Sequence, residues 1–118
     1  NYYLINILYQ IMNFKSFPTL TFARFNLIEI NESHIEDIFG LYSDHKVVQY
    51  IDIHPLKTLE EAKREIDIYK DRFLSKTGIR WGIVFTREIK IFGTIGFNKI
   101  YEGHKGRIGY DLEQKYWG

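Results

Sequence analysis

The chain has 118 residues, 45% of them hydrophobic and 17% aromatic, which is enough for one domain with a real core and too apolar for a disordered chain. Its 16 basic and 15 acidic residues leave a net charge of +1, which excludes a general electrostatic attraction to nucleic acid or to an anionic membrane. It contains no cysteine, which excludes disulfides, thiolate nucleophiles and cysteine-bound metals and fits a cytoplasmic protein.

The first fourteen residues are rich in Leu, Ile and Tyr. Asn6 and Gln10 interrupt this apolar run, which is too short to span a bilayer, and it lacks the basic start and cleavage site of a signal peptide. Met12 is the single methionine. Two interpretations stay open: residues 1–11 are read-through from upstream of a start at Met12, or they are a genuine extension. We therefore assign residues 1–21 to an N-terminal extension or read-through.

Residues 24–30 predict a β-strand whose imperfect alternation indicates that both faces are covered. Asn31 is a suitable N-cap for a helix that should end near residues 43–44. The apolar residues on one face of this helix are Ile35, Ile38, Phe39 and Tyr42. A short turn or helix is expected at 46–50.

Thr58 and Glu61 form a capping-box pair ahead of a long amphipathic helix. Its apolar residues recur every three or four positions: Leu59, Ala62, Ile66, Tyr69 and Phe73. Charged residues fill the opposite side, and Gly78 is expected to stop the helix.

The remainder predicts strands. Residues 79–87 and 91–99 are separated by a short hairpin connection at 88–90, and a glycine-containing loop leads to a third strand at 107–113. The order is strand, helix, helix and then three antiparallel strands. This order is typical of an α+β fold rather than of a parallel doubly wound one.

Several short motifs occur in a fixed order along residues 22–118. They are Arg24-Phe25-Asn26-Leu27, Ser43-Asp44 followed by Val47-Val48-Gln49-Tyr50, Thr58 with Glu61 and Ala62, Trp81-Gly82-Ile83, Gly93-Thr94-Ile95-Gly96-Phe97, and Ile108-Gly109-Tyr110-Asp111-Leu112 followed by Tyr116-Trp117-Gly118. This set resembles the RimJ/RimL-like branch of the GNAT-superfamily N-acetyltransferases. The first motif departs from the family pattern, because Phe22 stands where a threonine is usual and Thr21 comes one place early.

The resemblance implies a truncated GNAT-type α+β fold, with a mixed, mainly antiparallel sheet and two N-terminal helices. Residues 22–118 would form the N-terminal part of a single domain. In the family a glycine-rich turn follows the Trp-Gly pair and opens a helix that holds the coenzyme pyrophosphate. The sequence stops at Gly118, so we expect a fragment that lacks this loop and is inactive alone.

The resemblance also implies a function: transfer of acetyl from acetyl-CoA to a primary amine, either a protein N-terminus or a small molecule, without a metal. A different class stays open, a non-catalytic interaction module on the same scaffold. In the family, residues corresponding to 107–113 form a bulged central strand that pairs with the pantetheine arm. The main chain of Tyr110, Asp111 and Leu112 is therefore the expected coenzyme contact, while their side chains are expected to pack as in any strand.

Deprotonating an amine needs a carboxylate, an imidazole or an ordered water. Asp111 and Glu113 share a strand face opposite Tyr110 and Leu112, so either carboxylate could be the general base or hold the ammonium group. The alternative is a solvated strand face. Tyr116 is a candidate proton donor, with aromatic packing as its alternative.

Trp81 and Phe97 are candidates to line an acceptor groove, against the alternative that aromatic residues on central strands belong to the core. The four histidines show no spacing that would bind a metal. Without the strands and helix that follow in the family, the sheet should expose a pairing edge, through which we expect self-association.

Overall fold

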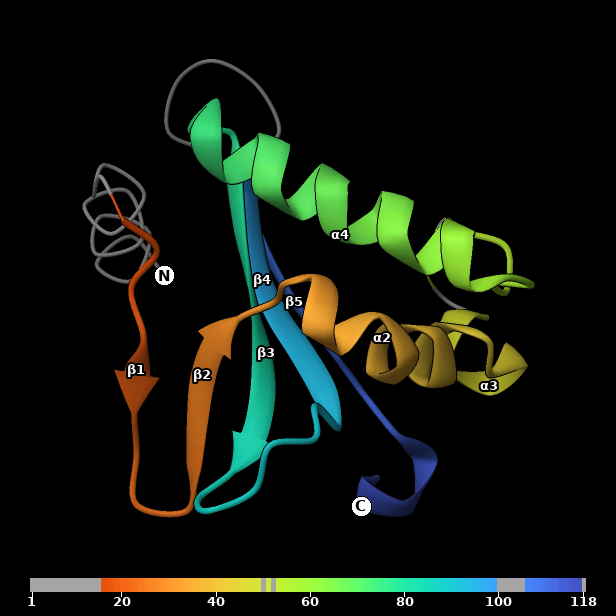
Figure 1. The fold of residues 1–118 in the computed structure, drawn as a ribbon, viewed down its shortest axis with the longest axis horizontal. Helices are drawn as coiled ribbons and strands as arrows, with labels where there is room; N and C mark the ends of the chain where they lie inside the picture. The colour runs from red at the N-terminus through yellow and green to blue at the C-terminus, as the bar shows by residue number, and fades with distance from the viewer. Residues whose placement is uncertain (1–15, 50, 52, 100–105, 118) are drawn as a thin grey trace.

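The structure, a computed structural model, describes residues 16–49, 51, 53–99 and 106–117. In these residues five strands pair in chain order, and every neighbouring pair is antiparallel (Figure 1). The strands are β1 (Leu20–Thr21), β2 (Phe25–Glu29), β3 (Gly78–Phe85), β4 (Gly93–Lys99) and β5 (Gly106–Leu112). The predicted α+β order is confirmed, while the expected mixed sheet is wholly antiparallel here, because no described crossover joins two parallel strands.

The α-helices are α2 (Ile35–Tyr42), α3 (His45–Val48) and α4 (Leu59–Leu74), with 3₁₀ turns η1 (Glu32–His34) and η2 (Gln114–Tyr116). All three α-helices lie where the sequence predicts them, apart from Tyr50, which lies outside the described residues. The capping box of α4 is present: Thr58 Oγ1 accepts from the Glu61 N–H at 3.1 Å, and Glu61 Oε1 accepts from the Thr58 N–H at 3.1 Å. None of the helices in the described residues is both long enough and apolar enough to cross a membrane.

The end of α4 differs from the prediction. The helix stops at Leu74, Lys76 follows with a φ of 61°, and Gly78 already begins β3. Gly78 is needed for a close approach: a Cβ there would lie 2.6 Å from Asn98 Oδ1 and 3.1 Å from the Phe97 carbonyl of β4. Glycine is therefore required at this position because β3 and β4 approach each other closely there, and not because the helix ends there.

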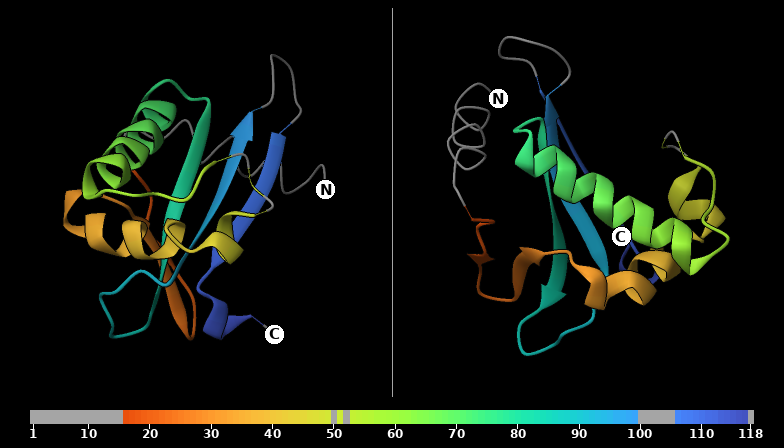
Figure 2. Two further views of the ribbon diagram at one scale, coloured as in Figure 1. Left: turned by 90° about the vertical axis from the view of Figure 1, so that its right-hand side faces the viewer. Right: turned by 45° about the horizontal axis from the view of Figure 1, so that its top comes forward.

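Helices α2 and α4 pack on each other and on one face of the sheet (Figure 2). Their buried apolar residues, Ile38, Leu41, Ala62 and Ile66 among them, form one cluster with the strand residues on that face. A second cluster lies on the opposite face and is joined by Phe73 from the end of α4; its other members are Leu27, Ile79, Trp81, Ile83, Phe92 and Phe97. Strand β2 contributes to both clusters, which explains its imperfect alternation.

The β3–β4 connection is longer than predicted and spans residues 86–92. Its last two residues, Ile91 and Phe92, are buried although they precede the strand. The Ile91 N–H donates to Asp37 Oδ2 at 3.0 Å, which ties the connection to α2. Arg87 takes a φ of 72° in the turn.

The resemblance led us to expect a central strand at 107–113. In the described sheet, however, β5 lies at the margin. Its register with β4 is one residue to one residue from Gly106 to Leu112, so the expected bulge is not present in this segment. An edge strand presents unpaired main-chain groups on its outer side.

Residues 16–21 contact the sheet. β1 pairs with β2, the Phe17 ring lies 5.0 Å from the Phe73 ring, and Trp81 Nε1 donates to the Pro18 carbonyl at 2.9 Å. These contacts concern only the end of the proposed extension. The domain boundary at residue 22 stays a prediction.

Candidate functional site

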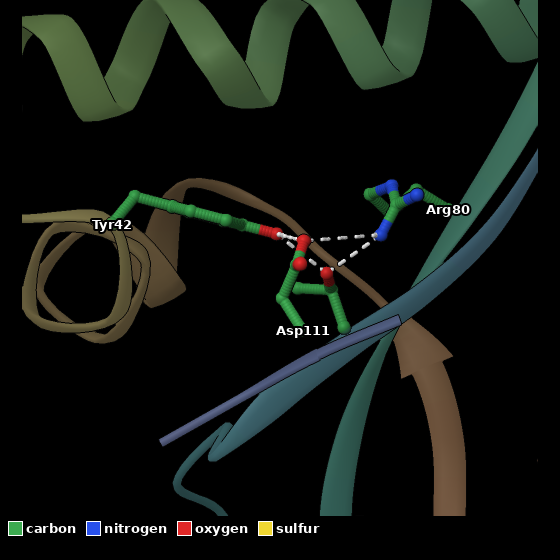
Figure 3. Close-up of polar contacts among 4 residues, drawn as sticks. Tyr42, Arg80 and Asp111 are labelled. Carbon is green, nitrogen blue, oxygen red and sulfur yellow. Dashed lines mark hydrogen bonds and ion pairs between the residues drawn. The ribbon is translucent and has the colours of Figure 1, made fainter. Parts of the chain in front are cut away.

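Asp111 is the residue around which polar side chains gather on the helix-facing side of the sheet. It points from β5 toward Tyr42 of α2 and Arg80 of β3 (Figure 3). Tyr42 Oη donates to Asp111 Oδ2 at 2.8 Å, and Arg80 Nη1 lies 3.9 Å from the same oxygen. The Asp111 side chain is 16% exposed, so it is neither fully solvated nor sealed in the core.

Thr94 of β4 completes this group and is the one buried polar or charged residue among those the structure describes. Its Oγ1 lies 2.6 Å from Tyr42 Oη and accepts from Arg80 Nη1 at 2.7 Å. Four elements therefore contribute one side chain each to a connected polar group, which we call the Asp111 network: Tyr42, Arg80, Thr94 and Asp111.

Two buried phenols lie at this site: Tyr42, within the network, and Tyr69, which lines the space beside it. Burial raises the pKa of Tyr42 and of Tyr69 well above the ordinary tyrosine value, because the charged phenolate would lose its solvation. Both phenols are therefore protonated near neutral pH, and the Tyr42 hydroxyl is available as a hydrogen-bond donor.

Two cavities flank Asp111. The first, which we call the polar cavity, has a volume of about 360 Å³ and lies between α4 and the sheet. It is lined by Tyr42, Ile51, Ile53, Glu65, Ile68, Tyr69, Arg72, Arg80, Asn98 and Asp111. The second, the edge cavity, has a volume of about 300 Å³ and is lined by Lys46, Val47, Ile51, Tyr110, Asp111, Leu112 and Trp117. Asp111 is accessible from both.

The edge cavity runs beside the free margin of β5. The Glu113 N–H donates to the Phe92 carbonyl at 3.0 Å, so Glu113 pairs toward β4. Because pairing alternates along an antiparallel strand, the main-chain groups of Asp111 also face β4, while those of Tyr110 and Leu112 face the free margin. The Leu112 carbonyl there accepts from Trp117 Nε1 at 2.8 Å.

A side-chain hydrogen bond links the two segments on either side of the edge cavity, the start of α3 and the end of β5. Gln114, just after β5, donates from Nε2 to Asp44 Oδ2 at 2.6 Å. Asp44 is the N-cap of α3, and this hydrogen bond is the main cause that lowers the pKa of its carboxyl. The segment after β5 is thereby fixed to the start of α3.

Strand β5 presents its side chains partly as expected. Asp111 faces the helices, and Tyr110 and Leu112 line an apolar groove on the opposite face. Tyr110 is 68% exposed, however, so it does not pack in a core as an ordinary strand residue would. The described residues leave this face of β5 uncovered at Tyr110.

The structure does not bring Glu113 and Tyr116 to Asp111. Glu113 Oε1 lies 3.5 Å from Lys90 Nζ as an ion pair without hydrogen-bond geometry. The Tyr116 ring packs on Phe92 with a centroid distance of 4.7 Å, which favours its packing alternative. Neither residue is among those that line the two cavities.

Trp81 and Phe97 occupy core positions. They are 3% and 1% exposed and belong to the cluster on the sheet face opposite Asp111. Their placement favours the core alternative over a position in an acceptor groove.

Three members of the network were not singled out from the sequence: Tyr42, Arg80 and Thr94. Arg80 carried a signal, since it is the one charged residue in the otherwise apolar run 79–85. Thr94 is likewise the one polar side chain in the run 93–97. Tyr42 was assigned to the apolar helix face, where its ring does pack, but its hydroxyl extends beyond that face to the network.

Comparison with known proteins gives the family. Residues 24–118 match the acetyltransferase (GNAT) domain. The chain is 31% identical over 102 residues to the uncharacterized N-acetyltransferase YoaA of Bacillus subtilis (strain 168), an alignment that covers 86% of this chain and 58% of YoaA. The chain thus spans somewhat more than half the length of this relative.

Two solved structures share the fold. One is RimL, a ribosomal L7/L12 alpha-N-protein acetyltransferase in complex with coenzyme A, with a TM-score of 0.72, 20% identity, and coverage of 86% of this chain and 59% of that one. The other is the acetyltransferase from Salmonella typhimurium that modifies the N-terminal serine of 50S ribosomal subunit protein L7/L12, with a TM-score of 0.71, 20% identity and the same coverage, 86% and 59%. With the family match over residues 24–118, these findings show that the chain belongs to the GNAT family of acetyltransferases.

Proposed function

We propose that the protein containing this chain transfers acetyl from acetyl-CoA to a primary amine. The observation that carries the proposal is the position of Asp111 in a GNAT domain, with the edge cavity on one side and the polar cavity on the other. A carboxylate at such a junction can meet an amine from one cavity and an acyl donor from the other.

The coenzyme side is the edge cavity. An extended arm with amide groups can add to a free strand margin through main-chain hydrogen bonds, as peptides do in strand addition. Tyr110 and Leu112 offer such groups, and Lys46 in the same lining supplies a positive charge. The proposed coenzyme contacts are therefore the main chain of Tyr110 and Leu112, with Asp111 contributing its side chain.

The amine side is the polar cavity. Asp111 holds the acceptor's ammonium group and takes its proton, which leaves the nitrogen lone pair free to attack. The nitrogen then forms the amide bond as the thioester C–S bond breaks, a second proton passes from the nitrogen to the departing sulfur, and the coenzyme leaves as its thiol. The RimL neighbours act on a protein N-terminus, and we propose the same broad class, a primary amine on a peptide or a small molecule, for this protein.

The proposal is tested on the full-length protein by following release of coenzyme thiol from acetyl-CoA with a panel of amines. Asp111→Asn removes the proton acceptor and should lower kcat/KM for the amine on the order of 100-fold. Asp67→Asn, which changes an exposed carboxylate on α4, is the matched control and should leave turnover unchanged.

Two results would count against the enzyme. Absence of turnover with every amine, together with no coenzyme binding by calorimetry, would overturn the proposal. Coenzyme binding without turnover would favour the non-catalytic module instead.

A further inference from the structure

Two hydroxyl groups connect Arg80 to Asp111, and chemistry fixes the direction of their hydrogen bonds. A guanidinium only donates, so Thr94 Oγ1 accepts from Arg80 Nη1 at 2.7 Å. The ionised carboxylate only accepts, so Tyr42 Oη gives its one proton to Asp111 Oδ2 at 2.8 Å. The proton of Thr94 is then left for Tyr42 Oη at 2.6 Å. The hydrogen bonds therefore run in one direction, from Arg80 to Thr94, from Thr94 to Tyr42, and from Tyr42 to Asp111.

Arg80 and Asp111 form an ion pair, but Arg80 gives its hydrogen bond to Thr94 and not to Asp111. Arg80 Nη1 is 2.7 Å from Thr94 Oγ1 but 3.9 Å from Asp111 Oδ2. Arg80 has space for this position because Gly96 lies beneath it: a Cβ at Gly96 would come 2.8 Å from Arg80 Nε. The hydroxyl of Thr94 thus takes the hydrogen bond that Arg80 would otherwise give to the carboxylate.

Both contacts made by Asp111 use the same oxygen. Oδ2 receives Tyr42 and faces Arg80, while no hydrogen bond or ion pair from the described part of the chain reaches Oδ1. Thr94 and Tyr42 are 0% and 3% exposed, so their hydrogen bonds are shielded from competing water. The arrangement fixes which carboxylate oxygen is occupied and which is open to a ligand.

We propose that Tyr42 and Thr94 are positioning residues: Tyr42 holds Oδ2 of Asp111 by a hydrogen bond and Thr94 takes the hydrogen bond of Arg80, so that Oδ1 is presented to the ammonium group of the acceptor. This inference rests on the proposed function, because it requires an amine at Asp111. It predicts that acceptor binding depends on the hydrogen bonds that Tyr42 and Thr94 make within the Asp111 network, although Thr94 does not line the polar cavity.

The test measures kcat and both KM values in the full-length protein. Tyr42→Phe removes the donor to Oδ2, and Thr94→Val frees Arg80 to give a hydrogen bond directly to Asp111. Each should raise the KM for the amine about 10-fold, the usual effect of losing a hydrogen bond to a charged group, with the KM for acetyl-CoA changed less than about 2-fold. Thr94→Ser keeps the hydroxyl and should restore the wild-type value. Ser43→Ala, which removes a hydroxyl bonded only within its own helix, is the control.

A double-mutant cycle separates positioning from a merely structural role. If Tyr42 acts through Asp111, then Tyr42→Phe should add less than about 2-fold to the effect of Asp111→Asn. Equal losses in both backgrounds, or variants whose amine KM matches that of an active wild type, would overturn this inference and leave the proposed function intact. A wild type that turns over no acetyl-CoA would overturn both.

Discussion

Gly96 and Gly109 lie opposite each other on β4 and β5 but meet different surroundings. A Cβ on Gly96 would lie 2.7 Å from the Ile79 carbonyl and 2.9 Å from Arg80 Cζ, distances that real side chains do not tolerate. A Cβ on Gly109 would meet nothing within 4 Å. One glycine is therefore required by its neighbours, and the other is not.

We expect Gly96→Ala to lower the free energy of unfolding by about 1–3 kcal/mol, because the backbone and Arg80 must shift to make room. Gly109→Ala should be neutral or stabilise by up to about 1 kcal/mol, because glycine is a poor strand residue where nothing requires it. Urea denaturation of both variants checks this. Equal losses at the two positions would show that the close contact at Gly96 is not the cause.

The sequence identifies individual candidate residues better than it identifies the side chains they contact. Asp111 can be selected from its strand position and its chemistry. Its contacts with Tyr42 and Arg80 depend on how α2, β3 and β5 pack, which no local spacing encodes. The same holds for Trp81, whose burial follows from the second cluster and not from its strand alone.

The first helical turn contains a pH-sensitive cap. His34 Nδ1 accepts from the Asn31 N–H at 3.0 Å, and Asn31 in turn caps η1. Burial lowers the pKa of His34, and the nearby Asp37 carboxylate opposes this only in part. The folded state thus prefers the neutral imidazole. Its contribution to stability is present above the unfolded value of 6.5 and is lost as the pH falls through the lower folded value.

We therefore expect the chain to lose stability as the pH is lowered from about 7.5 to about 5.5, the range in which an ordinary histidine gains its proton. His34→Gln keeps an acceptor at the capping-box position and should weaken this pH dependence. Urea midpoints at both pH values, in wild type and variant, provide the measurement. Parallel pH profiles would mean that the dependence comes from other groups.

Element positions follow from the sequence more reliably than element ends. The start of α4 is local, since Thr58 and Glu61 bond each other's main chain, and it is predicted correctly. Its end depends on β4 packing against Gly78, and there the prediction is wrong. β1 has two residues, too few for any alternation to be visible.

At the scale of the whole molecule, β5 leaves an apolar side chain uncovered in the described residues, since Tyr110 is 68% exposed. Beside its free margin lies an apolar groove of about 370 Å³, lined by Phe22, Phe25, Leu27, Ile83, Phe92, Ile95, Tyr110 and Leu112. Unpaired edges and contiguous apolar surface both promote association between copies.

We expect this chain alone to associate as its concentration rises, in sedimentation velocity runs. Tyr110→Lys places a charge in the groove beside the edge and should reduce the association. Leu74→Lys, at a residue that is 66% exposed at the end of α4, is the matched control and should have little effect. A monomer at every concentration would contradict the expectation.

The members of the Asp111 network are far apart in the sequence, which affects the order in which their contacts form as the chain is synthesised. Tyr42 and Asp111 are 69 positions apart, while Arg80 and Thr94 are only 14 apart. During synthesis on the ribosome, the hydrogen bonds of Thr94 with Arg80 and Tyr42 can form once the β3–β4 hairpin has emerged, but the bond from Tyr42 to Asp111 must wait for β5. Since distant pairings form after local ones, the Asp111 network acquires its carboxylate last, and nascent chains should pack α2 and α4 against β3 before the proposed amine site is complete.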